Sequence, residues 1–254
     1  MNQAKVLNFF GLLLIMFGIS FAIPLFVAIF YGESLIRVFG LGMSILVLMG
    51  FLSWFFTKDN KQELSLSDGF VITVLFWIVL SVSGSIPFIL FGFGFVDSFF
   101  ESMSGITTTG ATVIAGLDDL PKSLLIYRQL LQWLGGMGLI VLAIAVMPLL
   151  GIGGGQLFKT QTPGPMSEQR LTPRITSTAR ALWSIYFVLT VLCIFAYRLA
   201  GMSYFDAVSH AFSTVSIGGF STHDLSIGFF DSLSIEIVCI TFMLLSAMSF
   251  AVHY

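Results

Sequence analysis

The chain has 254 residues, of which 57% are hydrophobic and only 9% are charged, with a formal net charge of −2 and a mean hydropathy of +0.99. Soluble domains carry about 25% charged residues, so this composition excludes a water-soluble globule and indicates a polytopic membrane protein. No basic patch points to nucleic acid, and the two cysteines, Cys193 and Cys239, lie inside apolar runs without metal-ligand spacing around them.

Six apolar runs are long enough to be membrane spans, because about 20 residues cross the hydrocarbon core. The first is too long for the core of a signal peptide, so we predict that it is retained. The last runs to the final residue of the sequence, and we expect its helix to be truncated. In chain order the predicted spans are Val6–Phe30, Leu35–Phe56, Phe70–Phe91, Ser123–Leu150, Ala181–Ala200 and Leu233–Tyr254.

Two shorter segments, Val96–Ile106 and Tyr204–Val215, lie between spans and lead into polar stretches that contain glycine. Each has roughly ten residues and is too short to cross a bilayer. This pattern predicts re-entrant helices, each followed by a loop.

Two polar linkers separate the spans and set the expected topology. We place Thr57–Asp68 and the Gly-, Pro- and Ser/Thr-rich stretch Gly151–Thr178 on the cytoplasmic side, which then holds seven of the 11 Lys and Arg residues. This bias favours a cytoplasmic N-terminus. Most acidic residues fall on or near the outer side, where a negative mouth would concentrate cations.

The sequence contains an internal repeat. "DSFFESMSGITTTGAT" begins at Asp97 and "DAVSHAFSTVSIGGFS" begins at Asp206, an offset of 109 that pairs Gly110 with Gly219. We therefore predict an all-α membrane protein with two copies of a unit that consists of a span, a short re-entrant helix, a polar glycine loop and a second span. The predicted organisation is a helix pair over 1–57, a first unit over 69–150, a cytoplasmic linker over 151–178 and a second unit over 179–254.

Irregular backbone at membrane depth persists only where protein buries it or where it lines water. Two such loops in matching positions predict a shared axis, around which their carbonyl oxygens replace the hydration shell of an ion. The negative C-terminal ends of the short helices favour a cation, and Gly110 and Gly219 permit backbone conformations closed to other residues. The alternative reading is a pair of polar turns, which the repetition of the pattern disfavours.

At these residues the sequence resembles the Trk/Ktr/HKT superfamily of potassium uptake proteins, and within it the TrkH-type subunit of bacteria. The resemblance covers the whole chain. It rests on "TTTGAT" around Gly110, "STVSIGGFST" around Gly219, "YRQLLQWLGGMG" from Tyr127 and "SFAVHY" at the end.

The resemblance implies K⁺-channel-like repeats of span, pore helix, filter loop and span, four of which form a bacterial inner-membrane K⁺ pathway with one filter glycine each. It assigns Gly110 and Gly219 as K⁺ ligands through their backbone carbonyls, with Thr108, Thr109, Ile217 and Gly218 as flanking ligands. Because both repeats have glycine at the filter position, it implies a preference for K⁺. It also implies no organic cofactor, a cytosolic nucleotide-binding partner of the TrkA type and a homodimer of the full-length pore subunit.

Several polar residues near the loops are candidates for filter support. A buried ion pair between Glu101 and Arg128 is our preferred reading over direct ion contact, because charges in the membrane are usually paired, and His210 replaces Glu101 in the second repeat. His223 and Asp224 lack the further ligands of a metal site, and "GGMG" at Gly135 is expected to permit close helix packing. Hydroxyls that brace the loops or join the coordination are those of Thr107, Thr112, Ser216 and Ser221.

The leading functional hypothesis is potassium transport through a channel-like pore, without chemical catalysis. The alternative is a non-conducting, half-length scaffold that binds full-length subunits; an intramembrane enzyme ranks far below, since no nucleophile–base pair is found. Two loops offer only two sides of an ion cage. We therefore expect the chain to be the N-terminal half of a pore protein about twice as long, and not to conduct alone. Coupling to H⁺ or Na⁺ stays open.

Overall fold

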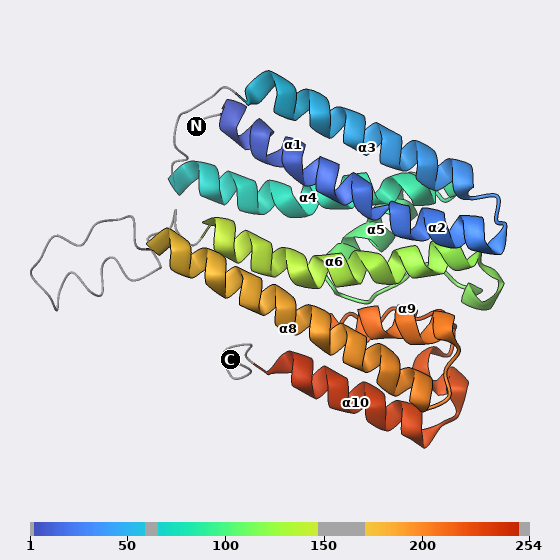
Figure 1. Cartoon of the computed structure of the whole chain (residues 1–254). Coiled ribbons are helices and arrows are strands. Elements are labelled where there is room, and N and C mark those ends of the chain that lie inside the picture. The colour runs from blue at the N-terminus through green and yellow to red at the C-terminus, as the bar shows by residue number, and fades with distance from the viewer. Residues whose placement is uncertain (1–2, 59–65, 147–170, 249–254) are drawn as a thin grey trace, which may run out of the picture.

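A computed structural model describes residues 3–58, 66–146 and 171–248, and the side chains of 3–58, 68–138 and 181–248. The described part consists of helices joined by loops, in the order α1 to α10 (Figure 1). The helices are α1 (Gln3–Ser20), α2 (Ala22–Tyr31), α3 (Ile36–Thr57), α4 (Leu66–Phe91), α5 (Phe95–Ile106), η1 (Leu117–Asp119), α6 (Lys122–Val146), α8 (Leu171–Leu199), α9 (Tyr204–Val215), η3 (Ser226–Phe230) and α10 (Leu233–Ala247).

Four stretches of the described residues are long and apolar enough to cross a membrane: Gln3–Tyr31, Ile36–Thr57, Asp68–Phe91 and Ala181–Leu199. The two other predicted spans correspond to α6 and α10, and both predictions extend beyond the described residues. The expected all-helical membrane fold is confirmed. The linker around residues 59–65, most of the linker before α8 and the "SFAVHY" motif after Met248 lie largely outside the described residues.

The first apolar run was expected to be one helix, but α1 ends at Ser20 and α2 begins at Ala22. The cause is Pro24, which has no N–H to donate to the Ser20 carbonyl four residues earlier. The Ser20 hydroxyl meanwhile donates to the Phe17 carbonyl at 2.6 Å. The single predicted helix is therefore two helical segments within one span.

Helix α8 begins at Leu171, within the C-terminal part of the predicted linker over 151–178, and its membrane-length apolar stretch begins at Ala181. Pro173 lies in the first turn of this helix. In that turn the missing N–H of proline has no intrahelical partner to lose.

Helix α6 is central to the arrangement. It packs against both short helices, α5 and α9, while α4 packs on α5 and α8 packs on α9. One apolar core joins α1, α3, α4 and α6, and a second joins α6 to α8, α9 and α10. In Figure 1, α9 lies in the half of the bundle that is farther from the N-terminus of α1. It is much shorter than α6 and α8, against which it packs.

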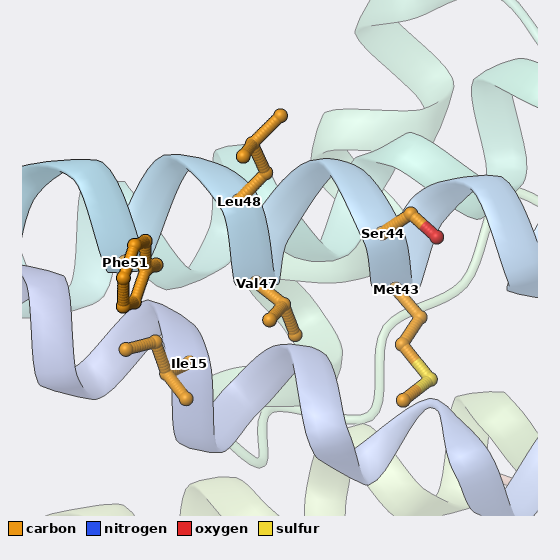
Figure 2. Close-up of a pocket in the computed structure, with 6 residues that line it drawn as sticks. All are labelled: Ile15, Met43, Ser44, Val47, Leu48 and Phe51. Atoms are coloured by element: carbon orange, nitrogen blue, oxygen red, sulfur yellow. The ribbon is translucent and has the colours of Figure 1, made fainter.

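An apolar groove lies between α1 and α3, away from the polar loops (Figure 2). The two helices approach closely beside it, since a Cβ at Gly11 would lie 2.9 Å from the Gly50 carbonyl oxygen. The groove has no charged residue in its lining, which consists of Ile15, Met43, Ser44, Val47, Leu48 and Phe51.

Candidate functional site

The two short helices end in the same backbone turn. After α5, the N–H groups of Thr108 and Thr109 donate to the carbonyls of Gly105 and Ser104 at 3.0 and 2.9 Å. This is a Schellman motif, in which the residue after the helix cap is left-handed and is usually glycine. Here that residue is Thr108, with φ of 55°.

The turn after α9 repeats this geometry 109 residues later. Ile217 has the same φ of 55°, and the N–H groups of Ile217 and Gly218 donate to Thr214 and Ser213 at 3.1 and 2.8 Å. A left-handed conformation costs a non-glycine residue roughly 1–2 kcal/mol, and a β-branched isoleucine is an outlier there. Strain kept at two matching positions is typical of a functional site.

The two loops also share a left-handed glycine and touch each other. Gly110 and Gly219 have φ of 80° and 86°. A Cβ at Gly110 would collide with the Gly218 carbonyl oxygen and lie 3.7 Å from the Gly219 Cα, whereas a Cβ at Gly219 would meet nothing within 4 Å. The structure thus brings the loop of the first repeat against that of the second, with Gly219 facing open space.

The hydroxyls predicted to support the loops make local contacts. The Thr107 hydroxyl lies 2.7 Å from the Met103 carbonyl and 2.7 Å from the Thr109 hydroxyl. The Ser216 hydroxyl donates to the Ser213 carbonyl at 3.2 Å. These side chains therefore fasten the loop starts to the helix ends.

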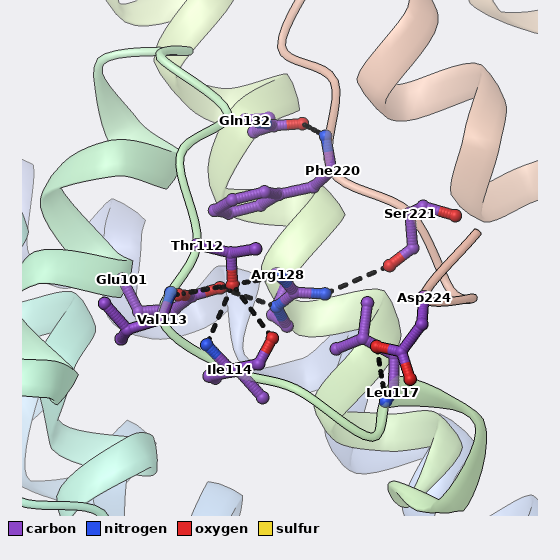
Figure 3. Close-up of polar contacts among 10 residues, drawn as sticks. All are labelled: Glu101, Thr112, Val113, Ile114, Leu117, Arg128, Gln132, Phe220, Ser221 and Asp224. Carbon is purple, nitrogen blue, oxygen red and sulfur yellow. Dashed lines mark hydrogen bonds and ion pairs between the residues drawn. The ribbon is translucent and has the colours of Figure 1, made fainter. Parts of the chain in front are cut away.

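The predicted Glu101–Arg128 pair is present and fully buried, with 2.7 Å between Arg128 Nε and Glu101 Oε1 (Figure 3). The Thr112 hydroxyl and the Val113 N–H donate to the same carboxylate at 2.9 and 3.3 Å. The other guanidinium nitrogens of Arg128 donate to the Ser221 carbonyl and to the Thr112 hydroxyl, both at 3.0 Å. Arg128 therefore joins the segments that follow the two loops.

In the second repeat His210 occupies the place of Glu101. Its Nε2 lies 2.9 Å from the Ser221 hydroxyl, and its Nδ1 lies 2.9 Å from the Asp206 carbonyl. Ser221 matches Thr112 in the repeat. In each repeat, therefore, the short helix hydrogen-bonds to a hydroxyl in the segment after its own loop, through Glu101 in α5 and through His210 in α9. This agrees with the expected buttressing role of His210.

The glycines of "GGMG" let α6 approach both helix ends. A Cβ at Gly135 would collide with the carbonyl oxygen of Ile106, the last residue of α5, and a Cβ at Gly136 would lie 2.7 Å from the Tyr186 hydroxyl and 3.2 Å from the Ser216 Cβ. The expected close packing is confirmed.

Sequence reasoning missed the contacts that link the two repeats beyond the loops. His223 Nδ1 is hydrogen-bonded to the Asp118 carboxylate, and its Nε2 lies 3.5 Å from Asp206 Oδ1. The hydrogen bond from His223 lowers the pKa of the Asp118 carboxyl. Asp224 accepts from the Leu117 N–H at 3.1 Å. Within the described ranges no cluster of His, Cys, Asp and Glu is suited to a metal ion.

Sequence reasoning also missed the contact of Gln132 with the second loop, although the two successive glycines in "IGG" from Ile217 are a signal of close packing there. Gly219 needs its left-handed φ, but Gly218 is glycine for another reason: a side chain there would overlap the Gln132 amide. Together the loops offer backbone carbonyls near the negative ends of two helices, which is an arrangement that attracts a cation.

Comparison with known proteins gives a consistent picture. A family model described as "TrkH: Cation transport protein" matches residues 35–254. The whole chain is 50% identical to the Trk system potassium uptake protein TrkH of Halomonas elongata and 49% identical to that of Vibrio parahaemolyticus, and covers 53% of each relative.

The Trk system potassium uptake protein TrkG of Escherichia coli is 46% identical over 96% of this chain and 51% of its own length. The crystal structure of the potassium transporter TrkH from Vibrio parahaemolyticus superposes with a TM-score of 0.87 at 47% identity, over 100% of this chain and 51% of that one. The chain thus spans about half the length of the relatives that it matches. On these grounds it belongs to the TrkH family of cation transport proteins.

Proposed function

We propose that this chain supplies two of the four filter loops of a potassium uptake pathway in a bacterial inner membrane. The observation that carries the proposal is the repeated loop geometry: two short helices, each ending in a strained Schellman turn and a left-handed glycine, whose loops meet at Gly110 and Gly218. The potassium uptake named for its relatives supports K⁺ as the ion.

In the proposed filter, K⁺ is held by the backbone carbonyls of Gly110 and Gly219. The carbonyls of Thr108, Thr109, Ile217 and Gly218 contribute further oxygens. Carbonyl dipoles replace the hydration shell of the ion, and their number and spacing discriminate K⁺ from Na⁺. The Glu101–Arg128 pair lies behind the loops as support, since its charges already satisfy each other.

Two loops surround an ion on two sides only. The open space beside Gly219 fits the proposal that further loops complete the cage, as in relatives about twice as long. The proposed assembly is a transporter with no catalytic step, is oriented with a cytoplasmic N-terminus, and works as a homodimer with a cytosolic TrkA-type subunit that contacts the basic linker over 151–178.

The proposal is tested by Rb⁺ uptake into K⁺-loaded vesicles that contain the complete four-loop assembly, purified through a tag on this chain. We expect uptake that external K⁺ suppresses and external Na⁺ does not, and no uptake in vesicles without protein. A folded four-loop assembly that carries no Rb⁺ under these conditions would contradict the proposal and favour a non-conducting scaffold.

A further inference from the structure

A single side chain from α6 holds the loop of the second repeat. Gln132 is fully buried, and its Oε1 accepts a hydrogen bond of 3.0 Å from the backbone N–H of Phe220 (Figure 3). Phe220 is itself buried, and its ring lies under the Arg128 guanidinium, whose central carbon is 4.4 Å from the ring centroid. Without Gln132 the Phe220 N–H would be a buried donor, which costs about 1–3 kcal/mol when it is left unsatisfied.

This hydrogen bond fixes the direction of a proposed ion ligand. The peptide between Gly219 and Phe220 is trans, and in a planar trans peptide the C=O and N–H point in opposite directions. Because the Phe220 N–H points at Gln132 on α6, the Gly219 carbonyl points away from α6. Gly219 has no Cβ to restrict its backbone, and a Cβ there would meet nothing within 4 Å. Packing around Gly219 therefore does not by itself fix the orientation of the peptide plane between Gly219 and Phe220.

The loop sequence accommodates Gln132. A Cβ at Gly218 would lie 2.7 Å from the Gln132 Nε2 and would overlap Cδ. In the first repeat the matching residue is Thr109, whose side chain is exposed and bonded to Thr107. The second repeat therefore has a glycine where the side-chain amide of Gln132 packs against the loop, whereas the first repeat has a threonine at the matching position.

We propose that Gln132 is a positioning residue that sets the orientation of the Gly219 carbonyl and thereby the ion selectivity of the second loop. The inference rests on the proposed function, since it assumes that this carbonyl faces the ion. It assigns selectivity to a side chain that does not touch the ion, through one hydrogen bond and one close packing contact.

Gln129 provides a matched control for this proposal. It lies one turn earlier on α6, is equally buried, and neither its Oε1 nor its Nε2 has a hydrogen-bond partner within the described part of the chain. Gln132→Leu and Gln129→Leu therefore make the same chemical change on the same helix. Only the first removes a hydrogen bond to the loop.

The test is the ratio of K⁺ to Na⁺ permeation, measured by competition with Rb⁺ uptake in vesicles that hold equal amounts of each variant. We expect Gln132→Leu to lower this ratio about fivefold, which corresponds to about 1 kcal/mol, the typical net value of one hydrogen bond. Gln129→Leu should leave it at the wild-type value. Equal ratios in both variants would overturn the inference.

Gly218→Ala perturbs the same contact from the loop side and covers the case in which Gln132→Leu does not accumulate. It should lower the ratio in the wild-type background but have little further effect in a Gln132→Ala background, because the space is then vacant. Independent, multiplicative effects would contradict the proposed contact. A wild-type protein without selective flux would refute the proposed function itself, whereas a selective protein insensitive to these changes would refute only the role of Gln132.

Discussion

Replacing either Glu101 or Arg128 by alanine should destabilise the protein more than an alanine substitution at an exposed charged residue does. Replacing both should cost no more free energy of unfolding than replacing one. Both side chains are fully buried. Glu101→Ala leaves Arg128 with two neutral acceptors, the Ser221 carbonyl and the Thr112 hydroxyl. Arg128→Ala leaves the carboxylate with two neutral donors, from Thr112 and Val113. In each case a buried charge loses its counter-charge.

Breaking a buried pair in this way costs about 3–5 kcal/mol. At roughly 2–4 °C for each kcal/mol in a chain of this size, each single variant should lose on the order of 6–20 °C in apparent Tm. The double variant has no isolated charge, so the cycle should show a coupling free energy of about 3 kcal/mol.

The assay is thermal unfolding of the detergent-solubilised protein, with each variant compared at the same concentration and ionic strength. Glu236→Ala and Arg37→Ala are the controls, because they delete the same groups at exposed positions, where such changes usually stay within about 0.5 kcal/mol. Losses that simply add in the double variant would refute the reasoning that the two charges compensate each other inside the membrane.

Two further predictions concern packing and pH. Gly135→Ala should destabilise the protein by roughly 2 kcal/mol, because the new Cβ meets the Ile106 backbone carbonyl. Gly40→Ala, at a position with open space around it, should instead stabilise the protein by about 0.5–1 kcal/mol through its higher helix propensity. Thermal unfolding of the two variants checks that the two changes have opposite signs. Because His223 lowers the pKa of Asp118, the carboxylate's contribution to stability is complete above its ordinary pKa of about 3.9 and is lost only as the pH falls below that value through the folded-state pKa. The difference in Tm between wild type and Asp118→Asn should therefore not shrink between about pH 8 and about pH 5, and a decline over that interval would contradict the assignment.

The local pattern of the sequence was sufficient for the helical fold and for the two short helices. Tyr204–Val215 was predicted with the bounds that α9 has, and Val96–Ile106 differs from α5 by one residue. Apolar length distinguishes a full span from a segment of about ten residues, and the repeat made each loop evidence for the other. The pairing of Glu101 with Arg128 followed from the cost of isolated charge in a membrane.

The contacts between repeats could not be read from such patterns. Gln132 and Phe220 are 88 residues apart in the sequence, and Asp118 and His223 are 105 apart. These contacts depend on how α6 lies between the two loops, and hydrophobic periodicity carries no information on that. The break near Pro24 was available from the sequence but was obscured by a continuous apolar run.

The central claim is that the loops at Gly110 and Gly219 form part of a K⁺ filter. Its most direct test is the ratio of K⁺ to Na⁺ permeation in vesicles for Gly110→Ser and Gly219→Ser, with Gly32→Ser as the control. All three glycines are left-handed, with φ of 80°, 86° and 67°, so each serine carries a similar backbone strain of roughly 1–2 kcal/mol, but Gly32 lies at the end of α2 with open space around it.

The account predicts that both loop variants lose selectivity for K⁺ or lose flux. Gly110→Ser should be the more severe, since its side chain also collides with the Gly218 carbonyl. Gly32→Ser should keep wild-type selectivity. Wild-type selectivity in both loop variants, at normal expression, would contradict the claim.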